Sequence, residues 1–286
     1  MKGVAARSGS GRPVADRAFG KGVARALAGA VLFGLPLLMT MEMWTLGFTM
    51  RSERLALMLL LAAPLLMGLA YYGGFRRNVG LGDSIIDGFV AFALGTVAAI
   101  LVLFSFGVLG RQSSIEQIVG VVALQSVPAA MGAALASSQL GRGQEERDDE
   151  EPEWGESYAG ELFLMVAGAL FFAFNMAPTE EIVRITLEQG HVAYAIGLML
   201  ASLLLLHAFV YALDFKGQHE QAHEHARLPP FVSLTLPGYA LVLLTSLLVL
   251  WLFGRVDGLG PAEALHMTAV LGLPGALGAA TARLVL

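Results

Sequence analysis

Eight apolar stretches, each long enough to cross the hydrocarbon core of a bilayer, constrain this chain more than any other feature. A helix of about 20 apolar residues spans the core, and backbone exposed to lipid must satisfy its hydrogen bonds within its own segment. The sequence therefore predicts an all-α, polytopic membrane helix bundle of eight transmembrane helices. The predicted spans are residues 27–48, 55–75, 85–109, 115–136, 158–183, 192–215, 231–254 and 262–285.

The composition excludes several classes of protein. Hydrophobic residues make up 56% of the chain and charged residues 14%, whereas charged residues make up about a quarter of a soluble domain. The chain has no cysteine, which excludes disulfides, thiolate metal sites and cysteine nucleophiles. It has no glycine-rich nucleotide loop and no basic stripe for nucleic acid. We expect the lipid bilayer as a partner and no nucleic acid, and the pattern specifies no cofactor.

The distribution of Lys and Arg predicts the orientation. With a cytoplasmic N-terminus, the cytoplasmic side carries thirteen of the 18 basic residues, and cytoplasmic loops are the ones enriched in Lys and Arg. We therefore expect a multi-pass protein of the cell inner (plasma) membrane with both termini in the cytoplasm. Residues 1–26 form a disordered, basic cytoplasmic tail in this interpretation. Residues 138–157 form an acidic cytoplasmic linker, with eight Asp or Glu between Glu145 and Glu156, that either acts as a solvated spacer or binds a cytoplasmic partner.

Residues 27–137 and 158–286 contain matching residues in the same order, which predicts two four-helix repeats. Each repeat has an even number of spans, so both copies cross the membrane in the same sense and are parallel. The offset changes from 140 to 147 within one loop, as an insertion of seven residues would cause. The matches given most weight are Thr40 and Glu42 with Thr179 and Glu181, Tyr71 with Tyr211, Glu116 with Glu263, Pro128 with Pro274, and Gly132 with Gly278.

A family resemblance rests on two acidic segments and the linker. Met41-Glu42-Met43-Trp44 and the segment 177–182, Ala-Pro-Thr-Glu-Glu-Ile, together with the acidic mid-chain linker, resemble a bacterial family of integral membrane proteins of unknown function. The resemblance covers most of the eight spans. It implies the eight-span architecture and assigns no catalytic or binding residue.

Glu42 and Glu181 are the acidic residues that most need an explanation. If spans one and five are continuous, both carboxylates lie near helix C-termini, where the helix dipole disfavours an anion. An ionisable group at such a depth costs about 2–3 kcal/mol unless it faces a cavity or a partner. We therefore expect Glu→Gln changes to be neutral or slightly stabilising. The open alternative is an interfacial position or a salt bridge to Arg51, Arg54 or Arg184.

Oxygen ligands gather around these two glutamates and predict a cation site. Pro36 and Pro178 each free a backbone carbonyl one turn earlier in the helix. Carbonyl, hydroxyl and carboxylate oxygens suit Na⁺, K⁺, Ca²⁺ or a proton. The predicted cation-binding residues are Glu42, Glu181, Glu180, Thr40, Thr179 and Asn175.

A second candidate site lies in the loop between spans six and seven. His219, Glu220, His223, Glu224 and His225 include the pattern H-E-x-x-H, which on a helix holds zinc between two imidazoles. A third ligand is not evident and the loop lacks the shielding that a hydrolase needs. The alternative is a solvated loop in which the three histidines are dispensable.

Three functions follow, in order of preference. The first is a cation channel or secondary transporter with a carboxylate site between the first and fifth transmembrane helices. The second is a non-transporting membrane scaffold or accessory protein. The third, and the one that would make the chain an enzyme, is a zinc-dependent membrane hydrolase.

Overall fold

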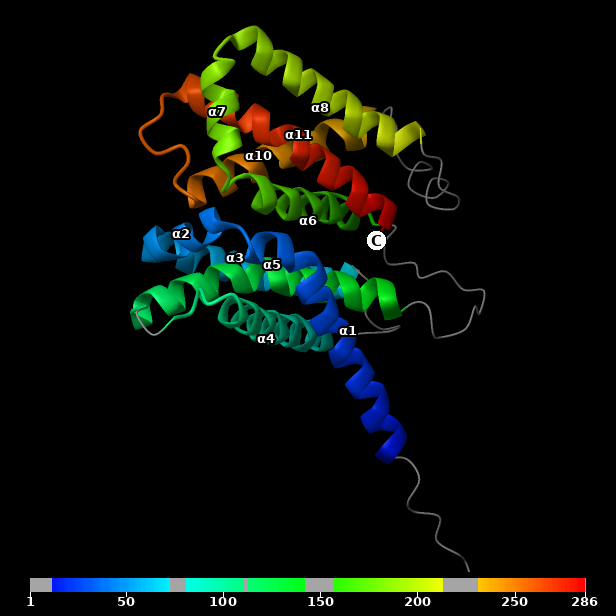
Figure 1. Ribbon diagram of the computed structural model, residues 1–286. Coiled ribbons are helices and arrows are strands. Elements are labelled where there is room, and N and C mark those ends of the chain that lie inside the picture. The colour runs from blue at the N-terminus through cyan, green and yellow to red at the C-terminus, as the bar shows by residue number, and fades with distance from the viewer. Residues whose placement is uncertain (1–11, 73–80, 111–112, 142–156, 213–230, 286) are drawn as a thin grey trace, which may run out of the picture.

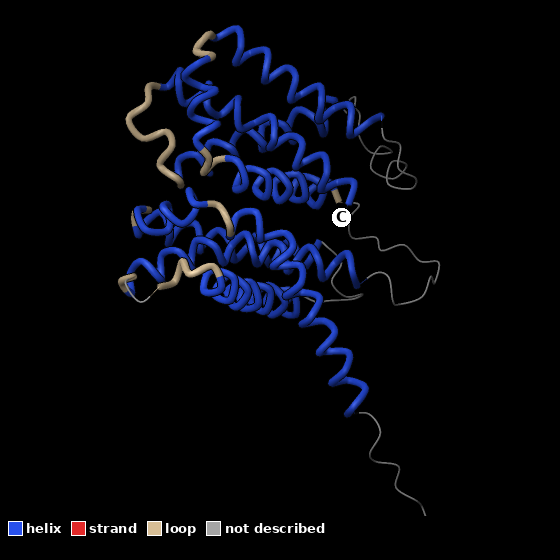
Figure 2. Tube along the Cα trace, viewed as in Figure 1, coloured by secondary structure: helices blue, strands red, loops and turns tan. Residues whose placement is uncertain are grey.

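The computed structural model describes residues 12–72, 81–110, 113–141, 157–212 and 231–285, which are largely helical and contain no strand (Figures 1 and 2). Eight of the helices in these ranges are long and apolar enough to cross a membrane, so the predicted helical class and eight spans are confirmed. Residues 1–11 and 142–156, which include part of the basic tail and most of the acidic linker, lie outside the described residues. The expected disorder of the tail was wrong for residues 12–26, which belong to the first helix. The first half comprises α1 (Arg12–Leu38), α2 (Met41–Thr49), α3 (Ser52–Tyr72), α4 (Leu81–Ser105) and α5 (Ile115–Gly141). The second half comprises α6 (Tyr158–Met176), α7 (Glu180–Glu188), α8 (Val192–Ala212), the π-helix η1 (Phe231–Thr235), α10 (Leu236–Leu252) and α11 (Pro261–Val285).

Each half therefore has one long helix, one helix of nine residues and three more long helices. The short helices α2 and α7 lie at the same end of the molecule (Figure 1), which we call the break end. The opposite end, where α5 leads toward α6, is the linker end. The arrangement of the halves as two repeats stays a prediction.

The last helix of each half forms its core. In the most apolar 18-residue segment of each span, the share of residues that is buried is 72% in α5 and 67% in α11, against 17–44% in the others. These two helices are rich in Ala and Gly, which permit close packing between membrane helices. Gly132 on α5 lies against Gly29 on α1, and Gly278 on α11 lies against Gly168 on α6; a Cβ at any of the four would collide with its neighbour.

The predicted extents of spans one and five were wrong. Span one was expected to run through Phe48, but α1 ends at Leu38 and α2 begins at Met41. Span five was expected to reach Val183, but α6 ends at Met176 and α7 begins at Glu180. At each break a threonine has an extended backbone, Thr40 with φ −85° and ψ 119° and Thr179 with φ −76° and ψ 152°. Pro36 and Pro178 remove amide donors near the breaks, which weakens the helices there.

The two halves meet along α3 and α6, with further contacts of α6 with α1 and α5 and of α3 with α10. Toward the linker end Tyr72 stacks on Phe163, with ring centroids 5.2 Å apart. Farther along, Phe33 meets Phe171 edge to face at 6.2 Å. The third contact between the halves, at the break end, is an ion pair and belongs to the site described next.

Candidate functional site

The break between α1 and α2 leaves carbonyl groups that the helix no longer satisfies, and side chains bind three of them. The Thr40 hydroxyl donates to the Pro36 carbonyl at 2.5 Å. Gln125 on α5, which is fully buried, donates from Nε2 to the Leu37 carbonyl at 3.2 Å. Trp44 donates from Nε1 to the Leu38 carbonyl at 2.7 Å. These hydrogen bonds stabilise the break, because buried carbonyls without donors are costly.

The break between α6 and α7 is held by an arginine from a distant loop. Arg255 donates from Nε to the Ala177 carbonyl at 3.2 Å and from Nη2 to the Pro178 carbonyl. Its Nη1 lies 3.7 Å from a carboxylate oxygen of Glu180, which is largely exposed. The guanidinium thus lies among two carbonyl oxygens and one carboxylate.

Two further predicted ligands at this break bind backbone groups of their own helix. Asn175 donates from Nδ2 to the Phe171 carbonyl at 2.7 Å. The Thr179 hydroxyl lies 2.9 Å from the Met176 carbonyl and donates to it. Both side chains therefore stabilise the end of α6. The Asn175 amide oxygen and the Thr179 hydroxyl oxygen could still accept a cation.

The premise that Glu42 and Glu181 lie at helix C-termini was wrong. Glu42 is in the first turn of α2, and Glu180 and Glu181 are in the first turn of α7. The positive end of the helix dipole stabilises an anion there. A hydrogen bond donated by its own backbone N–H is the largest of the effects that lower the pKa of Glu181. The expected effect of Glu→Gln changes on stability therefore reverses: loss of either charge should be slightly destabilising.

A partly buried ion pair joins the two halves at the break end, and the sequence did not reveal it. Arg54, at the start of α3, donates from Nη1 and Nη2 to the two carboxylate oxygens of Asp257 at 2.7 Å each. The Arg54 side chain is 7% exposed and that of Asp257 is 53% exposed. The guanidinium also lies 4.8 Å from the ring centre of Trp251, within cation–π range. Arg54 was considered only as a partner for the glutamates, and Asp257 was not identified.

The loop between α10 and α11, which contains Asp257, has a glycine next to these charges. Gly254 has φ +74°, and a Cβ there would lie 3.1 Å from Arg54 Nη1. The Arg54 hydrogen bonds, followed by the charges of Arg54 and Arg51, lower the pKa of Asp257 despite the opposing effect of partial burial. Two residues of one short turn thus make both contacts: Arg255 binds the α6–α7 break, and Asp257 binds Arg54 of the first half.

The predicted carboxylate site is divided between two places. Glu42 lies on α2, which packs against α5, whereas Glu181 lies on α7, which packs against α11. In the described ranges there is no group of three or more His, Asp or Glu residues able to hold a metal ion. Arg184 pairs with Glu188 at 2.6 Å on the surface of α7 rather than with Glu181. His219, His223 and His225 lie outside the described residues.

Comparison with known proteins agrees with this architecture. A family model described as "Putative integral membrane protein (DUF2391)" matches residues 22–286. The chain belongs to the DUF2391 family. No curated protein and no solved structure matched the chain. Membership of DUF2391 confirms the resemblance seen in the sequence and the location in a membrane, and the family's description names no chemistry. Function must therefore be argued from the two breaks themselves.

Proposed function

We propose that this DUF2391 protein is a cation channel or secondary transporter in which the α1–α2 break, with Glu42, binds the cation at the break end. The observation that carries the proposal is the position of the Arg255 guanidinium at the α6–α7 break. There a positive group binds two helix-end carbonyls and faces a carboxylate. Broken membrane helices bind ions through freed carbonyls of this kind.

The α1–α2 break offers similar oxygen atoms without a tethered arginine. Among the described residues no donor reaches the carbonyl of Met39, whereas its counterpart by sequence offset, Pro178, binds Arg255. Glu42 has no ion-pair partner within the same ranges. Gln125 presents a buried Oε1 that receives no hydrogen bond. Acceptors in excess of donors favour a cation at this break.

The proposal includes the two-repeat arrangement, because it makes the two breaks comparable. Three close contacts recur between helices at positions related by the offsets of 139, 140, 147 and 146 residues seen for the four spans. The pairs and their counterparts are Gly29–Gly132 and Gly168–Gly278, Met67–Gly88 and His207–Thr235, and Gly95–Ala129 and Val242–Gly275. If the sequence matches were due to composition alone, residues at equivalent positions would have no reason to contact equivalent neighbours. These pairs therefore support a tandem origin.

The orientation that we propose places the break end outside the cell and both termini in the cytoplasm. The excess of Lys and Arg at the linker end supports it. A cysteine introduced at Asp148 should react with a membrane-impermeant maleimide only after the membrane is opened. A cysteine at Gly110, on the other side, should react in intact cells. Because the native chain has no cysteine, each signal reports one position, and labelling of position 148 from outside would reverse the orientation.

The test of function is flux through proteoliposomes across a panel of Na⁺, K⁺, Ca²⁺ and H⁺. We expect Glu42→Gln to lower the flux of the transported cation about tenfold, the effect of losing about 1.4 kcal/mol of binding. The matched control is Glu181→Gln, which we expect to stay within about twofold because Arg255 already neutralises that break. The same cation should raise the melting temperature of the wild type but not of Glu42→Gln, since a ligand stabilises only the state that binds it.

Two results would contradict the proposal. Wild-type vesicles with no more flux than protein-free vesicles for every cation would favour a scaffold or accessory protein. Equal losses in Glu42→Gln and Glu181→Gln would show that the two breaks are not functionally distinct.

A further inference from the structure

The second half contains a line of uncharged polar groups that runs between its helices. At the linker end, His207 Nδ1 on α8 lies 3.1 Å from the buried hydroxyl of Thr235. At the break end the His266 ring on α11 lies 6.0 Å from that of Tyr194. Between them Tyr239 and Ser246 lie two turns apart on α10. We call Tyr239, Ser246 and His266, with His207 and Thr235 at the linker end, the polar seam.

In the part of the chain that the structure describes, three members of the polar seam have no partner for a buried polar atom. They are the Tyr239 hydroxyl, the Ser246 hydroxyl and Nε2 of His266, in residues that are 6%, 0% and 6% exposed. Ser202 on α8 faces the Tyr239 hydroxyl but makes no hydrogen bond of normal geometry with it, and donates its own hydrogen to the Leu198 carbonyl at 2.6 Å. A buried polar group without a partner is costly, so these three atoms need partners that the described residues do not supply.

The groups that satisfy these atoms must be uncharged and small. The helices α8 and α10 and the π-helix η1 contain no Asp, Glu, Lys or Arg, and an ion without a counter-charge is expensive in the membrane. The hydroxyls lie beside glycines on α11, in a narrow space. A Cβ on Gly272 would lie 4.0 Å from the Tyr239 oxygen and 2.8 Å from Leu243 Cδ2. A Cβ on Gly275 would lie 3.2 Å from Ser246 Oγ and 3.0 Å from Val242 Cγ1. Water fits these requirements, because buried water binds otherwise unsatisfied polar groups.

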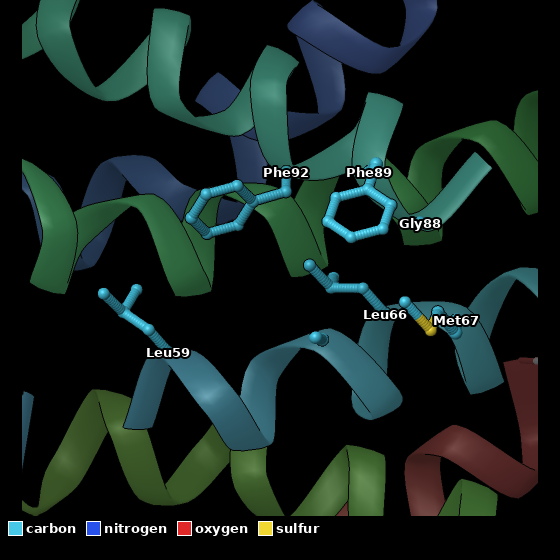
Figure 3. A pocket seen from close by; sticks show the side chains of 7 residues that line it. Leu59, Leu66, Met67, Gly88, Phe89 and Phe92 are labelled. Atoms are coloured by element: carbon cyan, nitrogen blue, oxygen red, sulfur yellow. The ribbon is translucent and has the colours of Figure 1, made fainter. Parts of the chain in front are cut away.

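The equivalent region of the first half is apolar. Subtracting 147 from 239 and 246 gives Phe92 and Ala99, and subtracting 140 from 207 gives Met67. There the helices α3 and α4 enclose a pocket lined by apolar groups, with the rings of Phe89 and Phe92 directed toward Leu59 and Leu66 (Figure 3). Polar groups at the corresponding positions are therefore a property of the second half alone.

We propose that the polar seam holds a file of buried water molecules and carries protons between the two ends of the second half. Imidazole exchanges protons near neutral pH, and the seam has one histidine toward each end. A proton taken up at His266 Nε2 passes along water and hydroxyl oxygens, each of which releases one proton as it accepts another, and leaves through His207. The path needs no redox partner. It lies apart from the cation site proposed at the α1–α2 break and does not depend on it.

Radiolytic hydroxyl-radical labelling of the purified full chain tests for the water. Irradiation activates bound water, so side chains next to it are oxidised even when they are buried. We expect oxidation of Tyr239 and His266. Met131 in the first half is the internal control, because it is equally buried, 1% exposed, and has a more reactive side chain. Labelling of Met131 with none at Tyr239 and His266 would overturn the proposal.

Proton entry into vesicles tests the path. With a potassium diffusion potential set by valinomycin and an entrapped pH dye, we expect proton entry to exceed that of protein-free vesicles. Tyr239→Phe and Ser246→Ala should each reduce it about tenfold, the effect of 1.4 kcal/mol on a barrier. Ser126→Ala is the matched control, since its buried hydroxyl is already bonded to the Val122 carbonyl at 2.6 Å. Labelled water without proton entry, or equal losses in all three variants, would overturn the proton path.

Discussion

Arg54→Gln should lower the free energy of unfolding by about 3 kcal/mol, although Arg54 was not among the predicted site residues. The change removes two charge-assisted hydrogen bonds to Asp257, and such bonds contribute about 1.5–3 kcal/mol. It also removes the cation–π contact with Trp251, which contributes about 0.5–2 kcal/mol. Asp257 is half exposed, so water recovers part of the loss at the carboxylate. Unfolding in mixed detergent micelles, followed by circular dichroism, measures the change.

The reverse variant and a matched control make this prediction specific. Asp257→Asn should be destabilising because it leaves the buried guanidinium without an anion, and the double variant should show a coupling of at least about 1 kcal/mol. Arg184→Gln removes a pair of the same chemistry that is 77% and 57% exposed, and exposed pairs contribute about 0–1 kcal/mol. Equal effects of Arg54→Gln and Arg184→Gln would show that the pair between the halves is not a structural contact.

The ion pair also has a predictable pH dependence. The pKa of Asp257 is lowered in the folded state, so its contribution to stability is complete above the ordinary carboxyl pKa, 3.8 for this group. The contribution is lost as the pH falls through the lower folded value. The difference in stability between the wild type and Asp257→Asn should therefore be constant from about pH 5 to pH 8.

Gly168→Leu should separate α6 from α11 and destabilise the second half by about 3 kcal/mol or more. Even a Cβ at residue 168 would collide with the backbone of Gly278 and would lie 2.6 Å from the Ala282 Cβ. Overpacking of this kind costs about 1–3 kcal/mol and sometimes more, and the backbone cannot move aside as a flexible side chain can. Gly29→Leu should have a similar effect in the first half, where Gly29 meets Gly132 and Ala136.

A glycine in open space provides a control of opposite sign. Gly197 lies within α8, and a Cβ at this position would have no neighbouring atom within 4 Å. Gly197→Ala should raise stability by up to about 1 kcal/mol through helix propensity. Melting temperatures of the purified variants distinguish the three cases. A Gly168→Leu protein as stable as the wild type would show that α6 and α11 do not pack through this contact.

The sequence alone determined the class of fold and the number of spans. Each apolar stretch is long enough to cross the bilayer, and each must form its own backbone hydrogen bonds in lipid. Both conditions concern one segment at a time, so they are readable without knowing what packs against it. The segment 192–215, for example, was expected as a span and contains α8 from Val192 to Ala212.

Only the tertiary structure decided where the first and fifth spans break and what the charges near them do. An extended threonine within an apolar run is tolerated when the freed carbonyls find donors. Thr40 and Trp44 are local donors. The others come from distant parts of the chain: Gln125 binds Leu37 from 88 residues away, and Arg255 binds Ala177 from 78 residues away. The partner of Arg54 is 203 residues away. Because α2 and α7 begin after these breaks, Glu42 and Glu181 lie at helix N-termini, where the dipole stabilises their charge, rather than at the C-termini that a continuous helix implies.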